Sequence, residues 1–477
     1  MRLFSSPSEV GARTGDAAWL RAMLDFEAAL AIALRDCGLA SAAAAEEIEV
    51  ACGARTPGAA GTNPSGPALS GSMTGWDLEA VGAGTAREGT PVPALLAQLR
   101  ARLSDEARAV LHRGATSQDV VDTAAMLVAK RALEPLLADL DAAGDAAAAL
   151  ADHHRDDLAA GRTLLQQALP ITFGLRAAGW LGGLDDAAVR LTAVRDERLA
   201  IQFGGAVGTL ASLGGEGLAV AEALARRLGL PAPSTPWQTN RARVVELAAA
   251  LGQAAGAAGK VGTDVVLLAQ TEVGEVAEGG SGGGSSTLPQ KRNPTNAVAA
   301  IAAARRAPGL VETLFAAMPG EQERAAGAWQ AEAETLAELL RLVGIAVAAV
   351  RSSLERLEVF PDRTRANLDL TDGLVMSESL ASALGETLGR ARGQELAAEA
   401  AKRVLAGGRP AADAGGGSAA GAGTSLAEAA AAIPEILDAL GADGIAAALD
   451  PGGYLGATDE LIDRALAAHR ERRAGAR

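Results

Sequence analysis

Residues 117–150 read SQDVVDTAAMLVAKRALEPLLADLDAAGDAAAAL, and this stretch decides the fold class. Its leucine, valine and methionine residues recur at helical spacing, and alanine fills most positions between them. Alanine is the strongest helix former, so the stretch predicts one long helix with a possible kink before Pro135. Period-two alternation of β-branched residues is nearly absent from the whole chain, so we expect an all-α protein.

Four other stretches show the same pattern, at residues 15–36, 170–200, 240–277 and 320–358. Helices of such length, apolar around much of their circumference, usually bury one another in a bundle. We therefore expect a central bundle of long helices. The predicted domains are an N-terminal helical domain (1–115), the bundle (116–360) and a C-terminal helical domain (361–477).

Composition narrows the class of partner. Hydrophobic residues make up 49% of the chain but aromatic residues only 3%, so the core must consist of alanine, leucine and valine. The net charge of −15 disfavours nucleic acid or an anionic membrane as a partner, but allows a small anion held by a local positive cluster. The N-terminus lacks a signal-peptide core and no apolar run is long enough to span a membrane, so we expect a cytoplasmic protein.

Glycine-rich segments interrupt the helical pattern. Residues 53–91 and 407–424 are expected to be loops. A third such segment, GGSGGGSSTLPQKRNPTN (279–296), has neither the frame nor the preceding strand of a phosphate-binding loop. Asn293 and Pro294 suit the start of a helix, so Lys291 and Arg292 would stand beside its positive end. This arrangement predicts an anion site carried by a mobile loop, whereas a plain linker would not require these residues.

A second polar segment, HRGATSQDVVDTA (112–124), contains the start of the long helix. Thr116 and Asp119 have the spacing of a capping box. Their neighbour Ser117 adds a second hydroxyl, and free amides at a helix start can hold a carboxylate. Capping alone is the alternative interpretation, and both roles can coexist on neighbouring residues.

Three segments together resemble the fumarase/aspartase superfamily. GSSTLPQKRNP (284–294) is similar to its signature loop, with Leu288 in place of the usual methionine. HRGATSQDVVDTA (112–124) and GRTLLQQALPITFG (161–174) resemble the two other signature regions, in the right order. The resemblance covers essentially the whole chain and implies a three-domain fold with a central long-helix bundle. It also implies a homotetramer, a small polycarboxylate substrate, and no metal or organic cofactor.

The resemblance also implies roles for individual residues. A serine of the mobile loop would remove a proton from the carbon next to a carboxylate, which matches Ser285 with Ser286 beside it. Such a serine needs loop closure and nearby positive dipoles to act as a base. Lys291 would stabilise the resulting doubly charged intermediate. Substrate-binding roles fall on His112, Thr116, Ser117, Gln118, Arg162, Gln166, Asn293 and Arg324.

One departure selects among the reactions of the superfamily. Members that eliminate an amine or water carry histidine after G-R-T, whereas this chain has Leu164, which cannot donate a proton. A carboxylate leaving group needs no proton, since it is stable as an anion near neutral pH. This favours the carboxymuconate cycloisomerases of aromatic-acid catabolism, which segments 321–332 and 365–380 also resemble. An adenylosuccinate lyase-like C–N lyase, a cycloisomerase for another muconate, and a catalytically silent scaffold are the alternatives.

Overall fold

The computed structural model describes residues 8–54, 75–280, 284, 287–288, 290–406 and 424–475. It divides into two compact units, each assembled from three stretches of chain. The first unit comprises residues 1–140, 186–259 and 299–348, and the second comprises residues 141–185, 260–298 and 349–477. Helices make up most of both units, which confirms the all-α prediction. The domain boundaries at 115 and 360 stay predictions.

Five helices have residues that belong to both units. They are α7 (Ser117–His153), α8 (Phe173–Glu197), α10 (Ala242–Leu268), α11 (Thr295–Ala304) and α13 (Glu332–Leu354). The predicted long helix at 117–150 is α7, which contains Pro135 without ending there. The buried residues are mainly alanine, leucine and valine, as the composition predicts.

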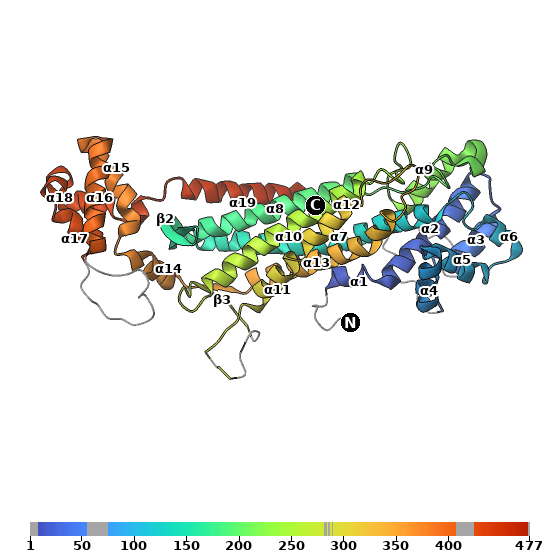
Figure 1. Ribbon diagram of the computed structural model, residues 1–477, viewed down its shortest axis with the longest axis horizontal. Coiled ribbons are helices and arrows are strands. Elements are labelled where there is room, and N and C mark those ends of the chain that lie inside the picture. Colours follow the sequence, from blue (N-terminus) through green and yellow to red (C-terminus); the bar gives the residue numbers. More distant parts are fainter. Residues whose placement is uncertain are drawn as a thin grey trace. The chain divides into compact units, whose positions relative to one another are not determined.

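The first unit also contains shorter helices, most of them from the N-terminal part of the chain. These are α1 (Glu9–Ala12), α2 (Asp16–Asp36), α3 (Ala42–Ala51), α4 (Leu78–Glu88), α5 (Val92–Arg100), α6 (Asp105–Val110), α9 (Gly217–Leu228) and α12 (Ala307–Ala316). Helix α2 packs against α3 and α9, and its apolar face is almost completely buried. Figure 1 shows α1 to α6 in blue and α9 in green. Helix α2 matches the prediction for residues 15–36.

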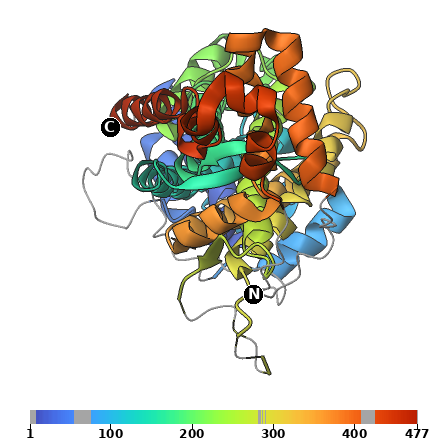
Figure 2. The ribbon, with the colours of Figure 1, turned by 90° about the vertical axis from the view of Figure 1, so that its left-hand side faces the viewer.

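The second unit contains two small antiparallel sheets and the C-terminal helices. These elements are β1 (Leu158–Thr163), β2 (Gln166–Thr172), β3 (Val276–Glu278), β4 (Leu357–Val359), α14 (Pro361–Leu368), α15 (Ser377–Leu388), α16 (Arg390–Ala406), α17 (Leu426–Ala431), α18 (Pro434–Ala448) and α19 (Thr458–Gly475). Strand β1 pairs with β2, and β3 pairs with β4. Figure 2 shows the β1–β2 hairpin beside the orange and red C-terminal helices, whose shared apolar core includes Ala160 of β1.

Several sequence predictions are wrong at their boundaries. Residues 78–88 form α4 inside the predicted loop 53–91. Helix α10 ends at Leu268, and residues 276–278 form β3 because they pair with β4 rather than continuing the helix. Helix α13 begins at Glu332, twelve residues after the predicted start at 320. Most of the expected loop 407–424 lies outside the described residues.

One buried cation joins three separated stretches of the first unit. The guanidinium of Arg241 donates to both oxygens of Asp122 on α7, at 2.8 and 2.9 Å, and to Glu332 at the start of α13. Its central carbon lies over the Trp237 ring, 4.7 Å from the ring centroid, and the Trp329 indole N–H donates to Asp122. Burial disfavours the charge, but Asp122 and Glu332 outweigh it and hold the pKa of Arg241 above its usual value.

The C-terminal helix α19 is held by a second charged cluster, in the second unit. The His469 ring lies between two carboxylates, with Nδ1 3.0 Å from Asp185 and Nε2 2.9 Å from Asp145. Arg472 donates to Asp185 and to Asp141, which is also on α7. Polar contacts to α7 and α8 therefore supplement the modest apolar surface of this strongly polar helix. None of the helices in the described ranges is both long and apolar enough to cross a membrane.

Replacing Arg241 with alanine should strongly destabilise the first unit. The substitution leaves Asp122 and Glu332 as buried charges without a cation, a change that typically costs about 3–5 kcal/mol. Urea denaturation followed by circular dichroism measures the loss. The control is Arg190→Ala, which removes an exposed arginine from α8 and should leave the midpoint nearly unchanged. Equal midpoints for the two variants would show that the ion cluster does not support the unit.

Candidate functional site

Two predicted binding residues meet at the start of α7. The Arg324 guanidinium donates to the Thr116 hydroxyl at 3.1 Å and to the carbonyl of Ala206 at 2.8 Å, although 208 residues separate Arg324 from Thr116. Arg324 forms no ion pair with any described carboxylate. Ser117, the first residue of α7, is half-buried beside this contact. The guanidinium of Arg324 and the neighbouring hydroxyls can together hold a carboxylate.

Asp119 anchors this helix start, as the capping-box spacing predicts. Its carboxylate accepts the backbone N–H of Thr116 at 3.1 Å, and also those of Gly204 and Gly205 at 3.1 and 2.9 Å. The Gln202 amide donates to it at 3.0 Å. Burial raises the pKa of Asp119 to about 6, although these four donors favour the anion. Asp119 therefore fixes the loop around Gly205 against α7 rather than binding a ligand.

Gln118 lies behind the site and supports it. Its side chain is fully buried and its amide nitrogen donates to the Gln238 carbonyl at 2.7 Å and to Asp122 at 3.2 Å. Its Oε1 atom is buried without a hydrogen-bond partner. The Gln238 amide in turn donates to the carbonyl of Gly205. Gln118 thus joins the helix start to the Arg241 cluster through Asp122.

His112 pairs with an acid that sequence reasoning did not identify. Its Nδ1 lies 2.7 Å from Oε1 of Glu27 on α2, whose side chain is completely buried. Burial opposes protonation of the ring, and Arg100 opposes it weakly. The negative charges of Glu27 and Asp119 outweigh both effects and raise the pKa of His112. The Nε2 atom has no partner among the described residues, so Glu27 orients a ring whose other nitrogen is available.

In the second unit, Arg162 is already engaged by an internal acid. Its guanidinium donates to both oxygens of Glu275, a fully buried carboxylate. Asn367 also donates to Glu275 at 2.9 Å, and Arg176 lies 3.6 Å away. Within this chain, Glu275 therefore neutralises the charge of Arg162, which leaves its predicted contact with substrate as a proposal.

The turn between β1 and β2 has an unusual conformation. Leu164 and Leu165 have φ angles of 50° and 65°, a left-handed region that disfavours residues other than glycine, asparagine and aspartate. Leu164 is 96% exposed and Leu165 69%, so neither contributes to the core. Gln166, the first residue of β2, is also exposed beside them. Within this chain, Leu164 therefore projects into solvent.

The signature loop lies partly outside the described residues, which exclude Ser285 and Ser286. Lys291 is exposed, and Gly284 pairs with Arg292 in an antiparallel bridge. The following helix, α11, begins at Thr295, as Asn293 and Pro294 predict within a residue.

An acid of the chain already accepts backbone N–H groups of the first turn of α11, so the predicted anion role of Lys291 and Arg292 beside this turn stays a prediction. The Glu278 carboxylate of β3 accepts the backbone N–H groups of Asn296 and Ala297 at 3.0 and 2.8 Å. It also accepts the side-chain amide of Asn296 at 3.1 Å. These amides are therefore not available to a substrate.

The residues that sequence analysis missed are acids: Glu27, Glu275 and Glu278. Each binds a group that the sequence predicted for a ligand. The only available signal was the density of acidic residues in 271–278, which did not reveal their partners. In the described part of the chain, no group of three or more His, Cys, Asp or Glu side chains is arranged to hold a metal ion.

Comparison with known proteins identifies the family. Residues 68–309 match the model of a lyase family of the fumarase/aspartase superfamily. The chain belongs to this lyase family. A 3-carboxy-cis,cis-muconate cycloisomerase of Bradyrhizobium diazoefficiens is 41% identical over 466 residues, which cover 97% of this chain and 96% of that protein. A nitrosuccinate lyase of Streptomyces davaonensis is 39% identical over 471 residues, covering 96% and 92%.

A solved structure confirms the fold. The 3-carboxy-cis,cis-muconate lactonizing enzyme from Pseudomonas putida matches with a TM-score of 0.85 and 38% identity, over 98% of both chains. This lyase therefore has the mostly helical fold of the fumarase/aspartase superfamily, as the resemblance implied.

Replacing Glu27 with glutamine should destabilise the lyase in a pH-dependent way. A histidine whose pKa is raised by folding contributes stability that is complete below about pH 6.5 and is lost as the pH rises through the raised value. The deficit of Glu27→Gln should therefore be largest near pH 6, at about 1.5–3 kcal/mol, and shrink toward pH 9. Melting temperatures measured across this range test the prediction.

The matched control is Asp25→Asn, two residues away on α2. Asp25 pairs with two arginines, Arg21 and Arg131, rather than with a histidine. Its deficit should stay constant over that range. A constant deficit for Glu27→Gln as well would contradict the pairing with a protonated His112.

Proposed function

We propose that this lyase interconverts 3-carboxy-cis,cis-muconate and a carboxymuconolactone. In lactonisation, a carboxylate oxygen of the substrate bonds to one end of the conjugated diene, and the carbon next to another carboxylate gains a proton. In the reverse reaction, Ser285 removes that proton and the ring carboxylate departs as an anion. Lys291 stabilises the intermediate in which negative charge develops on the neighbouring carboxylate.

The contact between Arg324 and Thr116 is the observation that carries the proposal. The substrate has three carboxylates, so its site needs cations that internal acids do not neutralise. Arg324 satisfies this requirement among the described residues, since its contacts are a hydroxyl and a carbonyl. Ser117 provides a further donor, and His112 a ring that Glu27 favours in its charged form.

The leaving group gives independent support for the cycloisomerase. By the resemblance, relatives that eliminate an amine carry a histidine at the position of Leu164. A leucine cannot protonate a departing nitrogen. A carboxylate departs without a proton. The similarity to cycloisomerases at 41% identity over nearly the whole chain agrees with this chemistry.

Nitrosuccinate cleavage is the second candidate, because a nitrosuccinate lyase is almost as similar to this chain. Its name indicates a dicarboxylate substrate with a nitro group. A nitro group that leaves as nitrite also departs as a stable anion, so the argument from Leu164 does not exclude it. The two candidates differ in product, since only one of them releases nitrite.

A homotetramer is the assembly that we propose, with motifs from different subunits completing each site. The β1–β2 turn supports it. Two adjacent leucines held exposed and at positive φ cost stability without contributing to the core of their own chain. Their retention is explained if the turn packs against another copy.

Purified protein should remove the ultraviolet absorbance of the conjugated diene of 3-carboxymuconate. Ser285→Ala should lower the rate by about 10²–10⁴-fold, because it removes the proton-transfer group. Ser286→Ala is the matched control and should retain most activity. The reverse pattern would transfer the role to Ser286, whereas nitrite release from nitrosuccinate with no diene loss would replace the proposed reaction.

The double substitution Leu164→Asn and Leu165→Gly should weaken the tetramer. Asparagine and glycine suit the left-handed turn, so the hairpin itself should become more stable by about 1–2 kcal/mol. The new turn, however, lacks the apolar surface proposed to contact a neighbouring copy. Sedimentation over a dilution series compares the variant with the native chain. A tetramer that dissociates at the same concentration in both would show that the turn lies outside the interface.

A further inference from the structure

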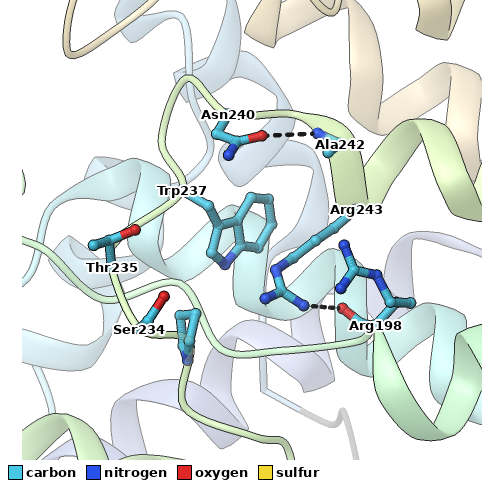
Figure 3. Close-up of a pocket in the computed structure, with 8 residues that line it drawn as sticks. Arg198, Ser234, Thr235, Trp237, Asn240, Ala242 and Arg243 are labelled. Atoms are coloured by element: carbon cyan, nitrogen blue, oxygen red, sulfur yellow. Dashed lines mark hydrogen bonds between the residues drawn. The ribbon is translucent and has the colours of Figure 1, made fainter.

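A hollow of about 110 Å³ lies in the first unit, beside the first turn of α10, and no signature residue lines it (Figure 3). Its lining residues are Arg198, Pro233, Ser234, Thr235, Trp237, Asn240, Ala242 and Arg243. No acidic residue lines it. A single water needs roughly 10–15 Å³ of such space, so the hollow has room for a small polyatomic ion.

The walls of this hollow are held in place. The Trp237 indole donates to the Ile201 carbonyl at 2.8 Å, and its backbone N–H donates to Gln202 at 2.7 Å. Arg198 is fixed by a two-pronged contact with Glu246. Prolines at 231, 233 and 236 restrict the loop that carries the two hydroxyl residues. A ligand would therefore meet a site that is largely formed in advance.

Its two guanidinium groups differ in how their charge is balanced. Glu246 neutralises Arg198, whereas Arg243 donates to the Arg198 carbonyl at 2.7 Å and has no carboxylate partner in the described residues. Burial, and then repulsion by Arg198, lower the pKa of Arg243. Figure 3 shows the two groups next to one another. The hollow thus retains one uncompensated positive charge in a chain whose net charge is −15.

Further donors surround this charge. The hydroxyls of Ser234 and Thr235 have no hydrogen-bond partner among the residues that the structure describes. The side-chain oxygen of Asn240 accepts the Ala242 N–H at 3.3 Å, which leaves its amide hydrogens as donors. A guanidinium, two hydroxyls and an amide form a donor set that suits the oxygens of a small anion.

We propose that this hollow is a binding site for a small oxyanion, such as phosphate, sulfate or a carboxylate. The anion neutralises Arg243 and accepts hydrogen bonds from the surrounding hydroxyls. Ser234, Thr235 and Asn240 are exposed, so the site is open to solvent and the ion exchanges freely.

A chain of hydrogen bonds connects Trp237, which lines the hollow, to the start of α7. Gln202 accepts the Trp237 N–H through its oxygen and donates through its nitrogen to Asp119 at 3.0 Å. Asp119 holds the Thr116 N–H. An anion that stiffens the 231–240 loop therefore stabilises the segment that carries Thr116 and Ser117.

Phosphate titration of the whole purified protein tests the site. The melting temperature should rise with phosphate and then saturate, compared with sodium chloride at equal ionic strength and pH. Equilibrium dialysis with labelled phosphate should give one ion per chain at this site, and sulfate and succinate should compete for it. The competition order identifies which oxyanion the hollow prefers.

Variants separate this site from the substrate site, which also attracts anions. Arg243→Met should weaken phosphate binding at least ~10-fold while Arg324→Met retains it. The paired change Ser234→Ala with Thr235→Val keeps all charges and should also weaken it, which covers the case in which Arg243→Met fails to fold. A phosphate effect equal to that of chloride, or one lost in Arg324→Met and retained in Arg243→Met, would overturn the proposal.

Discussion

A buried guanidinium, that of Arg241, is the interaction on which the rest of the first unit depends. It ties the interior of α7 to the start of α13 through Asp122 and Glu332. Gln118 bonds the same aspartate, so the helix start that carries Thr116 is held by the same cluster. A buried ion cluster contributes less net stability than an apolar core of equal volume, but it is favourable only when its charged groups are correctly placed. This geometric requirement explains how a core poor in aromatic residues fixes the position of the start of α7.

Internal carboxylates decide which positive groups can bind a substrate. Glu275 neutralises Arg162, and Glu278 caps the first turn of α11. Glu27 acts differently, because it charges and orients the His112 ring without closing off Nε2. Arg324 meets only a hydroxyl and a carbonyl among the described residues. In an acidic chain, a cation without an acid partner is therefore a better guide to an anion site than its position in a motif.

The sequence predicted the elements whose causes are local. Periodicity placed α2, α7 and α8 within a few residues, and cap chemistry placed the start of α7 at Thr116 and Ser117. It failed where long-range pairing decides the structure: residues 271–278 look helical, but β3 forms because β4 lies opposite it. The contact between Thr116 and Arg324 crosses 208 residues, so only the resemblance suggested a shared role. The partners of Glu27, Glu275 and Glu278 had no local signal.

The Leu164–Leu165 turn links chemistry to assembly. A histidine at Leu164 would serve a reaction that must protonate its leaving group, and that need disappears when the leaving group is already an anion. Removing the need for a proton donor explains why histidine is unnecessary, but not why two leucines occupy a turn that favours asparagine and glycine. Their strain and exposure require a compensating contact, and none exists within the described part of the chain. We propose that an apolar contact with another copy supplies that compensation, so that the same two leucines serve the assembly rather than proton transfer.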